Sequence, residues 1–356
     1  EARDLVSAGR KNMVINGDMR ISQRYGTIAT TISSGNFVID RYRCEDNTSG
    51  ATTHQQVADA PPGFYNSLKV TVTSTDTSVA AGDFHYFRHI IEGNNINHLN
   101  WGSSNAKTVT LSFWVKSSVT GNHGASLWNG PFDRSFPFNY EINSANTWEH
   151  KSITIPGCPD GSWETGTARG INIGFIQSVG STYTGTSNQW NSAGDIAPVN
   201  HVNLTATNGA TWYITGIQLE VGKNATDFEH RSYGEELALC QRYYYRHATG
   251  TTGAGGAQPI CNAVYYSTEN AFGVVTFPTT MRDIPDLDQN GSVTGFQILR
   301  AGAHEDITTF TVQERSNTAF TLECSGLSGT VGHAGWFRTT SDIVASVPYL
   351  GFSAEI

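Results

Sequence analysis

Short segments in which apolar and polar residues alternate recur along most of this chain, and this pattern constrains the fold more than any other feature. The clearest are TWYITGIQLEV at residues 211–221 and VTLSFWVK at residues 109–116. A period of two residues is typical of a β-strand that packs one face on a core. Further strands are expected at residues 13–15, 37–39, 68–72, 153–155, 171–175 and from 203 onward, with turn-rich stretches between them. Such spacing predicts a double-sheet jelly roll.

One segment breaks this pattern and predicts a helix. Residues 232–235, Ser-Tyr-Gly-Glu, have the spacing of a capping box, in which each side chain satisfies a backbone donor at the helix start. Glu235 and Glu236 would then lie at the positive end of the helix dipole, and Arg242 and Arg246 at its negative end. We therefore expect a helix from Ser232 to about Arg246 that links two β domains.

A second β domain is expected after this helix. ATGTTGAGGA at residues 248–257 is a Gly/Thr-rich linker or long loop, and six strand-like segments follow it, at residues 264–266, 272–277, 293–299, 308–312, 319–323 and 347–352. The predicted fold class is mainly β, with an N-terminal jelly-roll-like β-sandwich, one linking α-helix and a smaller C-terminal β-sandwich. The expected boundaries are a connector at 1–11, the jelly roll at 12–231, the helix at 232–247 and the C-terminal β domain at 248–356.

The charge and cysteine content limit the classes of partner. The formal net charge of −9 and a pI near 5.6 argue against nucleic-acid binding, which normally needs a basic patch. Five cysteines are an odd number, are widely spread and include no CxxC, so neither a disulfide framework nor a zinc site is indicated. Free thiols suit assembly in the bacterial cytoplasm. No apolar run is long enough for membrane insertion or a signal peptide, and since Glu1 is not an initiator Met we expect a fragment or processed product.

Four of the eight tryptophans are candidates for contact with a sugar. The apolar face of a sugar ring stacks on an indole, while its hydroxyls bind nearby amides and carboxylates. Trp128, Trp163 and Trp190 lie in Gly/Asn/Ser-rich stretches that are typical of loops, and Trp336 is the equivalent candidate in the second domain. The alternative for each is that it anchors a loop by packing.

A partial calcium motif starts at Asp286. Asp286, Asp288 and Asn290 place oxygens at positions one, three and five of such a loop, and Gly291 is at position six. Gln297 replaces the expected glutamate at position twelve, so an Asn-Gly hairpin turn is the stronger interpretation. No cofactor is predicted, and Ca²⁺ is the one ion that the sequence leaves open. No known catalytic motif is present, so we predict a protein that is not an enzyme.

Several motifs follow one another in a fixed order over roughly residues 10–246. They are RKNMVINGDM at 10–19, Gln23-Arg24, Asp40-Arg41-Tyr42, VTLSFWVK at 109–116, ITGIQLEVG at 214–222 and ATDFEHRSYGEELALCQRYY at 225–244. In these motifs the chain resembles tail-fibre and other virion surface proteins of tailed bacteriophages. The resemblance implies a β-sandwich similar to a carbohydrate-binding module at 12–231, a place in the virion, and partners among other virion proteins and host cell-surface polysaccharide.

The leading hypothesis is therefore a non-enzymatic tail fibre or similar appendage that attaches to host glycan. Two alternatives are a capsid decoration or stalk protein without a ligand, and a glycan-cleaving depolymerase. A homotrimer is expected from the resemblance and from the helix. Once Leu237, Cys240 and Tyr244 are assigned to the sandwich, Leu239 and Tyr243 form a second apolar helix face that is a candidate interface. The competing interpretation is that both helix faces pack within one chain.

Overall fold

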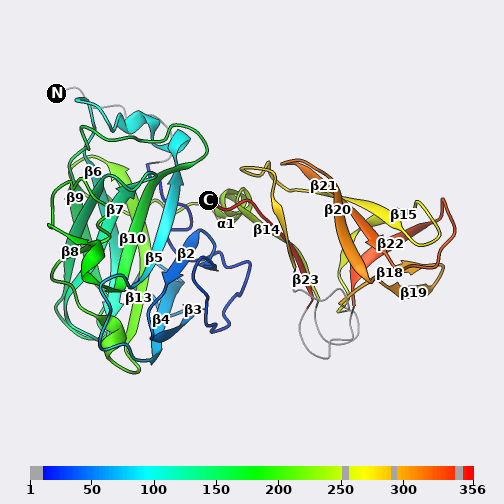
Figure 1. Ribbon diagram of the computed structural model, residues 1–356, viewed down its shortest axis with the longest axis horizontal. Helices are drawn as coiled ribbons and strands as arrows, with labels where there is room; N and C mark the ends of the chain where they lie inside the picture. The colour runs from blue at the N-terminus through cyan, green and yellow to red at the C-terminus, as the bar shows by residue number, and fades with distance from the viewer. Residues whose placement is uncertain (1–10, 251–255, 290–294, 341–347) are drawn as a thin grey trace. The chain divides into compact units, whose positions relative to one another are not determined.

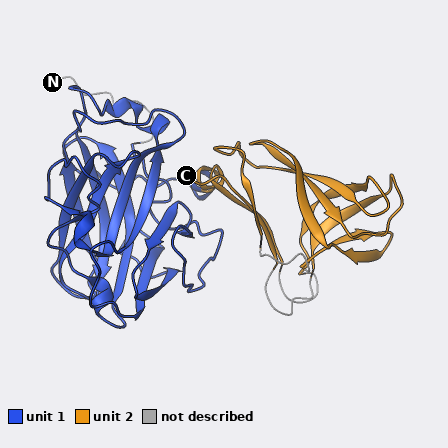
Figure 2. Cartoon of the chain, viewed as in Figure 1, with its two compact units in different colours: residues 1–236, 356 blue, residues 237–355 orange. Residues whose placement is uncertain are grey.

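The structure is a computed structural model that describes residues 11–250, 256–289, 295–340 and 348–356 (Figure 1). The chain is mainly β, as predicted, and α1 (Tyr233–Gln241) is the one α-helix among the described residues. It divides into two compact units, residues 1–236 with 356 and residues 237–355 (Figure 2). None of the five cysteines forms a disulfide in the described structure, which agrees with the prediction of reduced thiols. Within the described residues, no helix has the length and apolar character needed to cross a membrane.

Unit 1 is a sandwich of two antiparallel sheets. The six-stranded sheet has the order β1 (Phe37–Ile39), β2 (Tyr42–Asp46), β5 (Phe84–Glu92), β10 (Arg169–Val179), β7 (Gly121–Asn129) and β8 (Ser135–Ile142). The five-stranded sheet has the order β3 (Ala51–Val57), β4 (Ser67–Ser74), β13 (Thr211–Val221), β6 (Val109–Ser117) and β9 (Glu149–Ile155). Connecting segments form the 3₁₀ turns η1 (Gly93–Asn95), η2 (Asn97–Leu99), η3 (Ser181–Tyr183) and η4 (Leu204–Ala206), and the short strands β11 (Thr184–Gly185) and β12 (Ala197–Pro198).

The alternating residues of both sheets meet in one core. Phe113 of β6 contacts Phe175 of β10 at 5.1 Å between ring centroids, and Trp212 of β13 stacks on Phe87 of β5 at 6.4 Å. These pairs join the two sheets face to face, and their side chains are almost wholly buried. The expected strands at residues 68–72, 109–116, 171–175 and 211–221 thus bury apolar side chains between the sheets.

Strand β13 alternates less regularly than its sequence predicts. Its register with β6 shifts between Thr215 and Gln218, where Gly216 has a φ of 65°. Trp212 and Ile214 face the core before this bulge, whereas Ile217 and Leu219 are fully buried after it. A β-bulge adds one residue to a strand and so switches the buried face. A Cβ at Gly216 would come within 2.7 Å of Phe64, which explains why glycine stands at the bulge.

Two segments predicted as strands are not strands. Residues 13–15 lack strand structure, and 203–210 contain η4 and a turn, so that β13 begins at Thr211. The N-terminal segment instead crosses β13, where the Ile217 N–H donates to the Gly17 carbonyl at 2.9 Å. A Cβ at Gly17 would lie 2.2 Å from the Ile217 carbonyl oxygen, so only glycine permits this approach.

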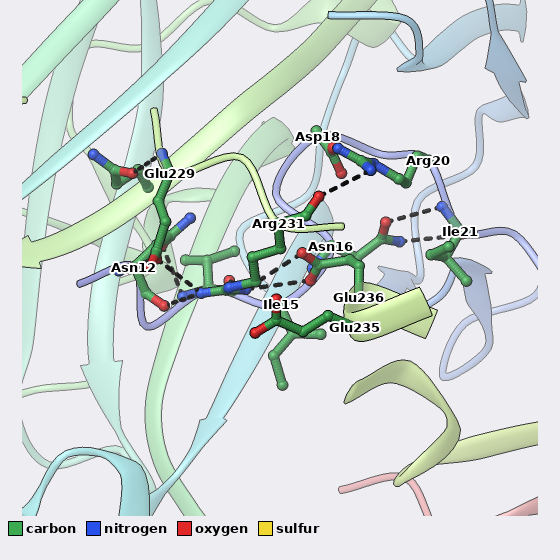
Figure 3. Close-up of polar contacts among 12 residues, drawn as sticks. Asn12, Ile15, Asn16, Asp18, Arg20, Ile21, Glu229, Arg231, Glu235 and Glu236 are labelled. Carbon is green, nitrogen blue, oxygen red and sulfur yellow. Dashed lines mark hydrogen bonds and ion pairs between the residues drawn. The ribbon is translucent and has the colours of Figure 1, made fainter. Parts of the chain in front are cut away.

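Arg231 holds the N-terminal segment against the segment that follows β13 (Figure 3). Its guanidinium donates to the Val14 carbonyl at 3.1 Å and to the Asn12 carbonyl, and it pairs with Glu229 at 3.2 Å and Glu236 at 3.3 Å. Glu236 in turn accepts the backbone N–H of Asn16 at 2.6 Å. The motif at residues 10–19 and the motif at residues 225–244 thus meet at the buried guanidinium of Arg231.

The helix is shorter than predicted. The Glu235 N–H donates to the Ser232 hydroxyl at 3.3 Å, so the predicted N-cap is present, but α1 ends at Gln241. Residues 244–249 form strand β14 (Tyr244–Thr249), which pairs with β23 (Tyr349–Ser353). Aromatic residues favour strands, and this pairing with a distant segment overrides the local helix signals. The predicted helix at 242–247 is therefore wrong, and since Tyr243 is 1% exposed it does not form a free apolar face with Leu239.

Unit 2 consists of a three-stranded and a seven-stranded sheet around a second core. The first has the order β14, β23 and β17 (Asp286–Gln289). The second has the order β19 (Ala303–Asp306), β18 (Phe296–Arg300), β22 (Ala334–Thr339), β15 (Pro259–Tyr265), β16 (Ala271–Thr276), β21 (Ala319–Ser325) and β20 (Thr309–Arg315). Phe296, Phe320, Phe337 and Phe352 are fully or almost fully buried in this core.

Candidate ligand-binding groove

Trp336 stands on the outer face of the seven-stranded sheet. On β22 the residues alternate, so that Phe337 is fully buried in the core while Trp336 is 60% exposed. It is the one tryptophan that is exposed in the described part of the chain. Backbone pairing places Trp336 opposite Asn262 of β15 on one side and opposite Leu299 of β18 on the other. An indole is therefore flanked by an amide and an aliphatic side chain on three adjacent strands.

A groove of about 500 Å³ runs beside Trp336. Its lining comes from three strands and one turn, and consists of Asn262, Leu299, Arg300, Ala301, Gly302, Ala334, Gly335 and Trp336. Ala301 and Gly302 form a two-residue hairpin turn in which both φ values are positive, 51° and 81°. Such a turn matches the twist of the strands that it joins. Because a Cβ at Gly335 would lie 2.8 Å from Ile298, glycine also keeps β22 close to β18 beneath the groove.

A second hollow of about 490 Å³ lies on the other side of Asn262, which lines both. Its walls include Val264 and Val274, which are 51% and 56% exposed. Tyr266 follows at the end of β15, is 70% exposed, and contacts Phe272 edge-on at 5.1 Å. At about 3.3 Å per strand residue, Tyr266 lies roughly 13 Å along the chain from Asn262. The outer face thus offers two aromatic side chains with an apolar floor between them.

The chemistry of this face suits a neutral polyhydroxylated ligand. A hollow of this size is in the range of small-ligand sites, and its exposed indole can stack on an apolar ring face. The Asn262 amide can both donate and accept hydrogen bonds. Arg300 is held in place because it donates to Glu305 at 3.3 Å and to the Ser328 carbonyl at 3.1 Å. No carboxylate lines either hollow among the residues that the structure describes.

The structure does not place Trp128 in a loop. It lies in β7, is 3% exposed, and packs edge-on against Tyr86 at 5.7 Å. The expectation of a loop was wrong because β7 continues through Asn129 and the turn begins only at Gly130. Gly174 of β10 faces the ring, and a Cβ there would meet the indole at 2.5 Å. Burial leaves no open face of Trp128 for a sugar.

Trp163 and Trp190 come together with a third tryptophan that the sequence did not single out, Trp101. The ring centroids of the three lie 4.6 to 5.7 Å apart and all three pairs meet edge to face. Each indole N–H donates to a backbone carbonyl, at Lys107, Asp160 and Pro156 respectively for Trp101, Trp163 and Trp190. This geometry anchors the loops around residues 100, 160 and 190. Trp163 and Trp190 remain partly exposed, so their contact with a glycan stays a prediction.

The partial calcium motif does not begin as a loop. Asp286 and Asp288 lie in strand β17, which pairs with β23, and Asn290 lies outside the described residues. Asp288 accepts hydrogen bonds from the hydroxyls of Tyr244 at 2.8 Å and Tyr349 at 3.2 Å. The Asp288 carboxylate is therefore already bound by two side chains of unit 2.

No protein-family model and no curated protein matches the chain. Among solved structures, the enzymatically active domain of tailspike protein 4 from bacteriophage CBA120 is 13% identical with a TM-score of 0.29, over 56% of this chain and 22% of that one. A CBM4 structure is 14% identical with a TM-score of 0.29, over 59% and 99%. A family 11 carbohydrate-binding module from Clostridium thermocellum is 10% identical with a TM-score of 0.27, over 56% and 98%. At these values the chain is placed in no family.

Proposed function

We propose that this protein binds host cell-surface polysaccharide as a tail fibre or similar appendage of a phage virion, and that it acts by binding without catalysis. The observation that carries glycan binding is Trp336, exposed between Asn262 and Leu299 on the wall of a groove. The ordered motifs shared with phage virion surface proteins support the place in the virion and assembly in the host cytoplasm.

The groove has the features that a sugar needs and a flat protein surface lacks. Stacking on an aromatic ring contributes about 1 kcal/mol beyond area burial, and the hydrogen bonds of an amide fix the orientation of the hydroxyls. The groove is open at the sheet surface, so an extended chain can lie across the strands toward Tyr266. We expect weak binding by one groove, because only one indole and one amide contact each sugar ring directly.

Binding of fluorescently labelled full-length protein to host cells and to purified surface polysaccharides tests this function. We expect Trp336→Ala to weaken binding at least about tenfold, which corresponds to ~1.4 kcal/mol. Trp336→Phe should retain part of the affinity, because a smaller ring still stacks, and Asn262→Ala should weaken it by a smaller factor. Tyr65→Ala is the matched control, since Tyr65 is 78% exposed and lies in unit 1 outside both hollows.

Three other outcomes would contradict the proposal. Release of reducing sugar ends from the polysaccharide would show a depolymerase. If neither cells nor any glycan bind the parent protein, a decoration or stalk protein without a ligand is favoured. If Trp336→Ala changes the mass of the protein oligomer in light scattering but leaves glycan binding intact, the exposed face is a contact between subunits and the groove is not the glycan site.

A further inference from the structure

A cysteine and two histidines from three strands converge inside unit 1. Cys44 of β2 and His85 of β5 come from the six-stranded sheet, and His54 of β3 comes from the five-stranded sheet. The thiol sulfur and one nitrogen of each imidazole lie within 4.8 Å of one another. The three side chains therefore bridge the two sheets of the sandwich at the level of β2 and β3.

All three residues are buried, with exposures of 0% for Cys44, 2% for His54 and 1% for His85. The Thr52 hydroxyl contacts a nitrogen of both rings, at 2.8 Å for His54 and 3.4 Å for His85. The Nδ1 atoms of both histidines have no hydrogen-bond partner among the described residues. A buried polar atom without a partner costs free energy, and two such atoms in one cluster call for an explanation.

The surroundings keep both imidazoles neutral. Burial and, to a smaller extent, the neighbouring His85 together lower the pKa of His54 to about 3. Burial also lowers the pKa of His85, although Asp46 opposes this shift. The ring of Phe87 packs edge-on against His54 at 4.8 Å between centroids. Neutral imidazole is the form that binds a metal.

We propose that Cys44, His54 and His85 form a binding site for a zinc-class transition-metal ion that ties the two sheets of unit 1 together. Thiolate and imidazole are the ligands such ions prefer. In a tetrahedral zinc site, bonds of about 2.0–2.3 Å set the ligand atoms roughly 3.3–3.8 Å apart, so shifts of about 1 Å close the set. The Thr52 hydroxyl or a water supplies an oxygen as the fourth ligand. Binding replaces the thiol proton by the metal, releases that proton to solvent and involves no redox change.

This site differs from the zinc patterns that sequence analysis looks for. Its ligands come from three separate strands, β2, β3 and β5, so no short spacing motif in the sequence marks them. Cys44 and His85 come together because β2 pairs with β5. In this register Cys44 lies opposite Phe87, and Asp46 lies opposite His85. His54 is added only when the two sheets pack.

Metal titration of the chelator-treated, reduced full-length protein tests the site. After removal of excess ion by gel filtration, we expect one Zn²⁺ or Co²⁺ per chain. The cobalt form should show a thiolate-to-cobalt charge-transfer band in its optical spectrum. At a hundredfold excess over Kd, the thermal midpoint should rise by about 5–10 °C. Cys44→Ser should abolish the charge-transfer band, and His54→Gln should weaken retention of the ion at least tenfold.

Two matched variants keep the test specific. Cys324→Ser removes another buried thiol in unit 2, and His123→Gln removes a buried histidine outside the cluster, so both should bind the ion like the parent. The spectrum of the parent protein needs no variant, so it decides the question even if Cys44→Ser does not fold. A parent that retains no ion or shows no thiolate band overturns the proposal, as does a folded Cys44→Ser protein with unchanged binding.

Discussion

Arg231 is the residue on which the N-terminal segment of unit 1 most depends. Its side chain is 4% exposed, and it donates to two backbone carbonyls and pairs with two carboxylates. Without Arg231, the carboxylates of Glu229 and Glu236 and the nearby backbone carbonyls lose the cation that they share. Breaking a buried pair from one side costs about 3–5 kcal/mol. We expect Arg231→Met to lower the free energy of unfolding by that amount in urea denaturation.

Arg315→Ala is the comparison for this variant. Arg315 is 54% exposed and its nitrogen lies 3.8 Å from Asp286, so its loss should change the free energy of unfolding by less than about 0.5 kcal/mol. Equal effects of the two substitutions would show that the buried network of Arg231 contributes no more than a surface pair.

Glu149 gives a prediction for pH dependence. Burial raises the pKa of this carboxyl, but hydrogen bonds from Lys151, Ser144 and Asn143 outweigh burial and lower the pKa from 4.5 to about 2. A folded pKa below the unfolded value stabilises the fold above pH 4.5, and this contribution is lost as the pH falls toward 2. The urea midpoints of the parent and Glu149→Gln should therefore differ near pH 7, and the difference should shrink below pH 4.5 and be nearly gone at about pH 2. A difference that grows on acidification, or one that the exposed control Glu141→Gln reproduces, would contradict this assignment.

The sequence identified tryptophans with suitable neighbours, but it could not tell which of them are exposed. Trp336 lies in a stretch with the same Gly-rich character as the one around Trp128, yet the first is 60% exposed and the second 3% exposed. The difference arises because β7 is an inner strand whose outer face is covered by the 180–197 segment, including the buried Ile196. Trp101 lies in an equally Asn/Gly/Ser-rich stretch, NHLNWGSSN at residues 97–105, so composition could have marked it, but its contacts with Trp163 and Trp190 depend on loops far apart in sequence.

At the scale of elements, the turn between β18 and β19 carries a testable strain. Ala301 has a φ of 51°, in the left-handed region that costs a residue with a Cβ about 1 kcal/mol or more, whereas Asn tolerates it. We expect Ala301→Asn to raise the free energy of unfolding by about 0.5–1 kcal/mol. Gly302→Ala, in open space at a φ of 81°, should lower it by about 1 kcal/mol. Two shifts of the same sign in thermal melts would rule out backbone strain as the cause.

Local patterns predicted where strands lie better than where they change. The alternation at residues 109–116 matches β6 because no bulge interrupts its buried face. In β13 the single Gly216 within an alternating run was the available sign of a bulge. The segment after α1 had dipole-matched charges that favour a helix, but its three consecutive tyrosines, Tyr243 to Tyr245, are residues that favour a strand. Pairing with β23 decides between the two, and no local pattern contains that information.

At the scale of the whole molecule, the sequence predicts that the chain is mainly β, but not how its side chains combine. Asn262 and Trp336 meet because β15 and β22 pair, and the Cys44, His54 and His85 cluster needs both sheets of unit 1. Strand order determines such neighbours, and it depends on contacts between distant segments. Trp336 could therefore be named from the sequence as a single candidate, whereas its neighbours in the groove and the metal cluster could not.

The last prediction concerns the number of chains in the protein oligomer. We expect a homotrimer, since the ordered motifs resemble those of phage virion surface proteins and since one groove with one exposed indole binds weakly. Three linked grooves can raise avidity on the order of a hundredfold without any new contact. Light scattering should then give three times the 38.6 kDa mass of one chain, and binding to glycan-coated surfaces should exceed binding to a soluble oligosaccharide by that factor. A mass of one chain at micromolar concentration, with equal affinity for surface and soluble glycan, would contradict both the trimer and the avidity argument.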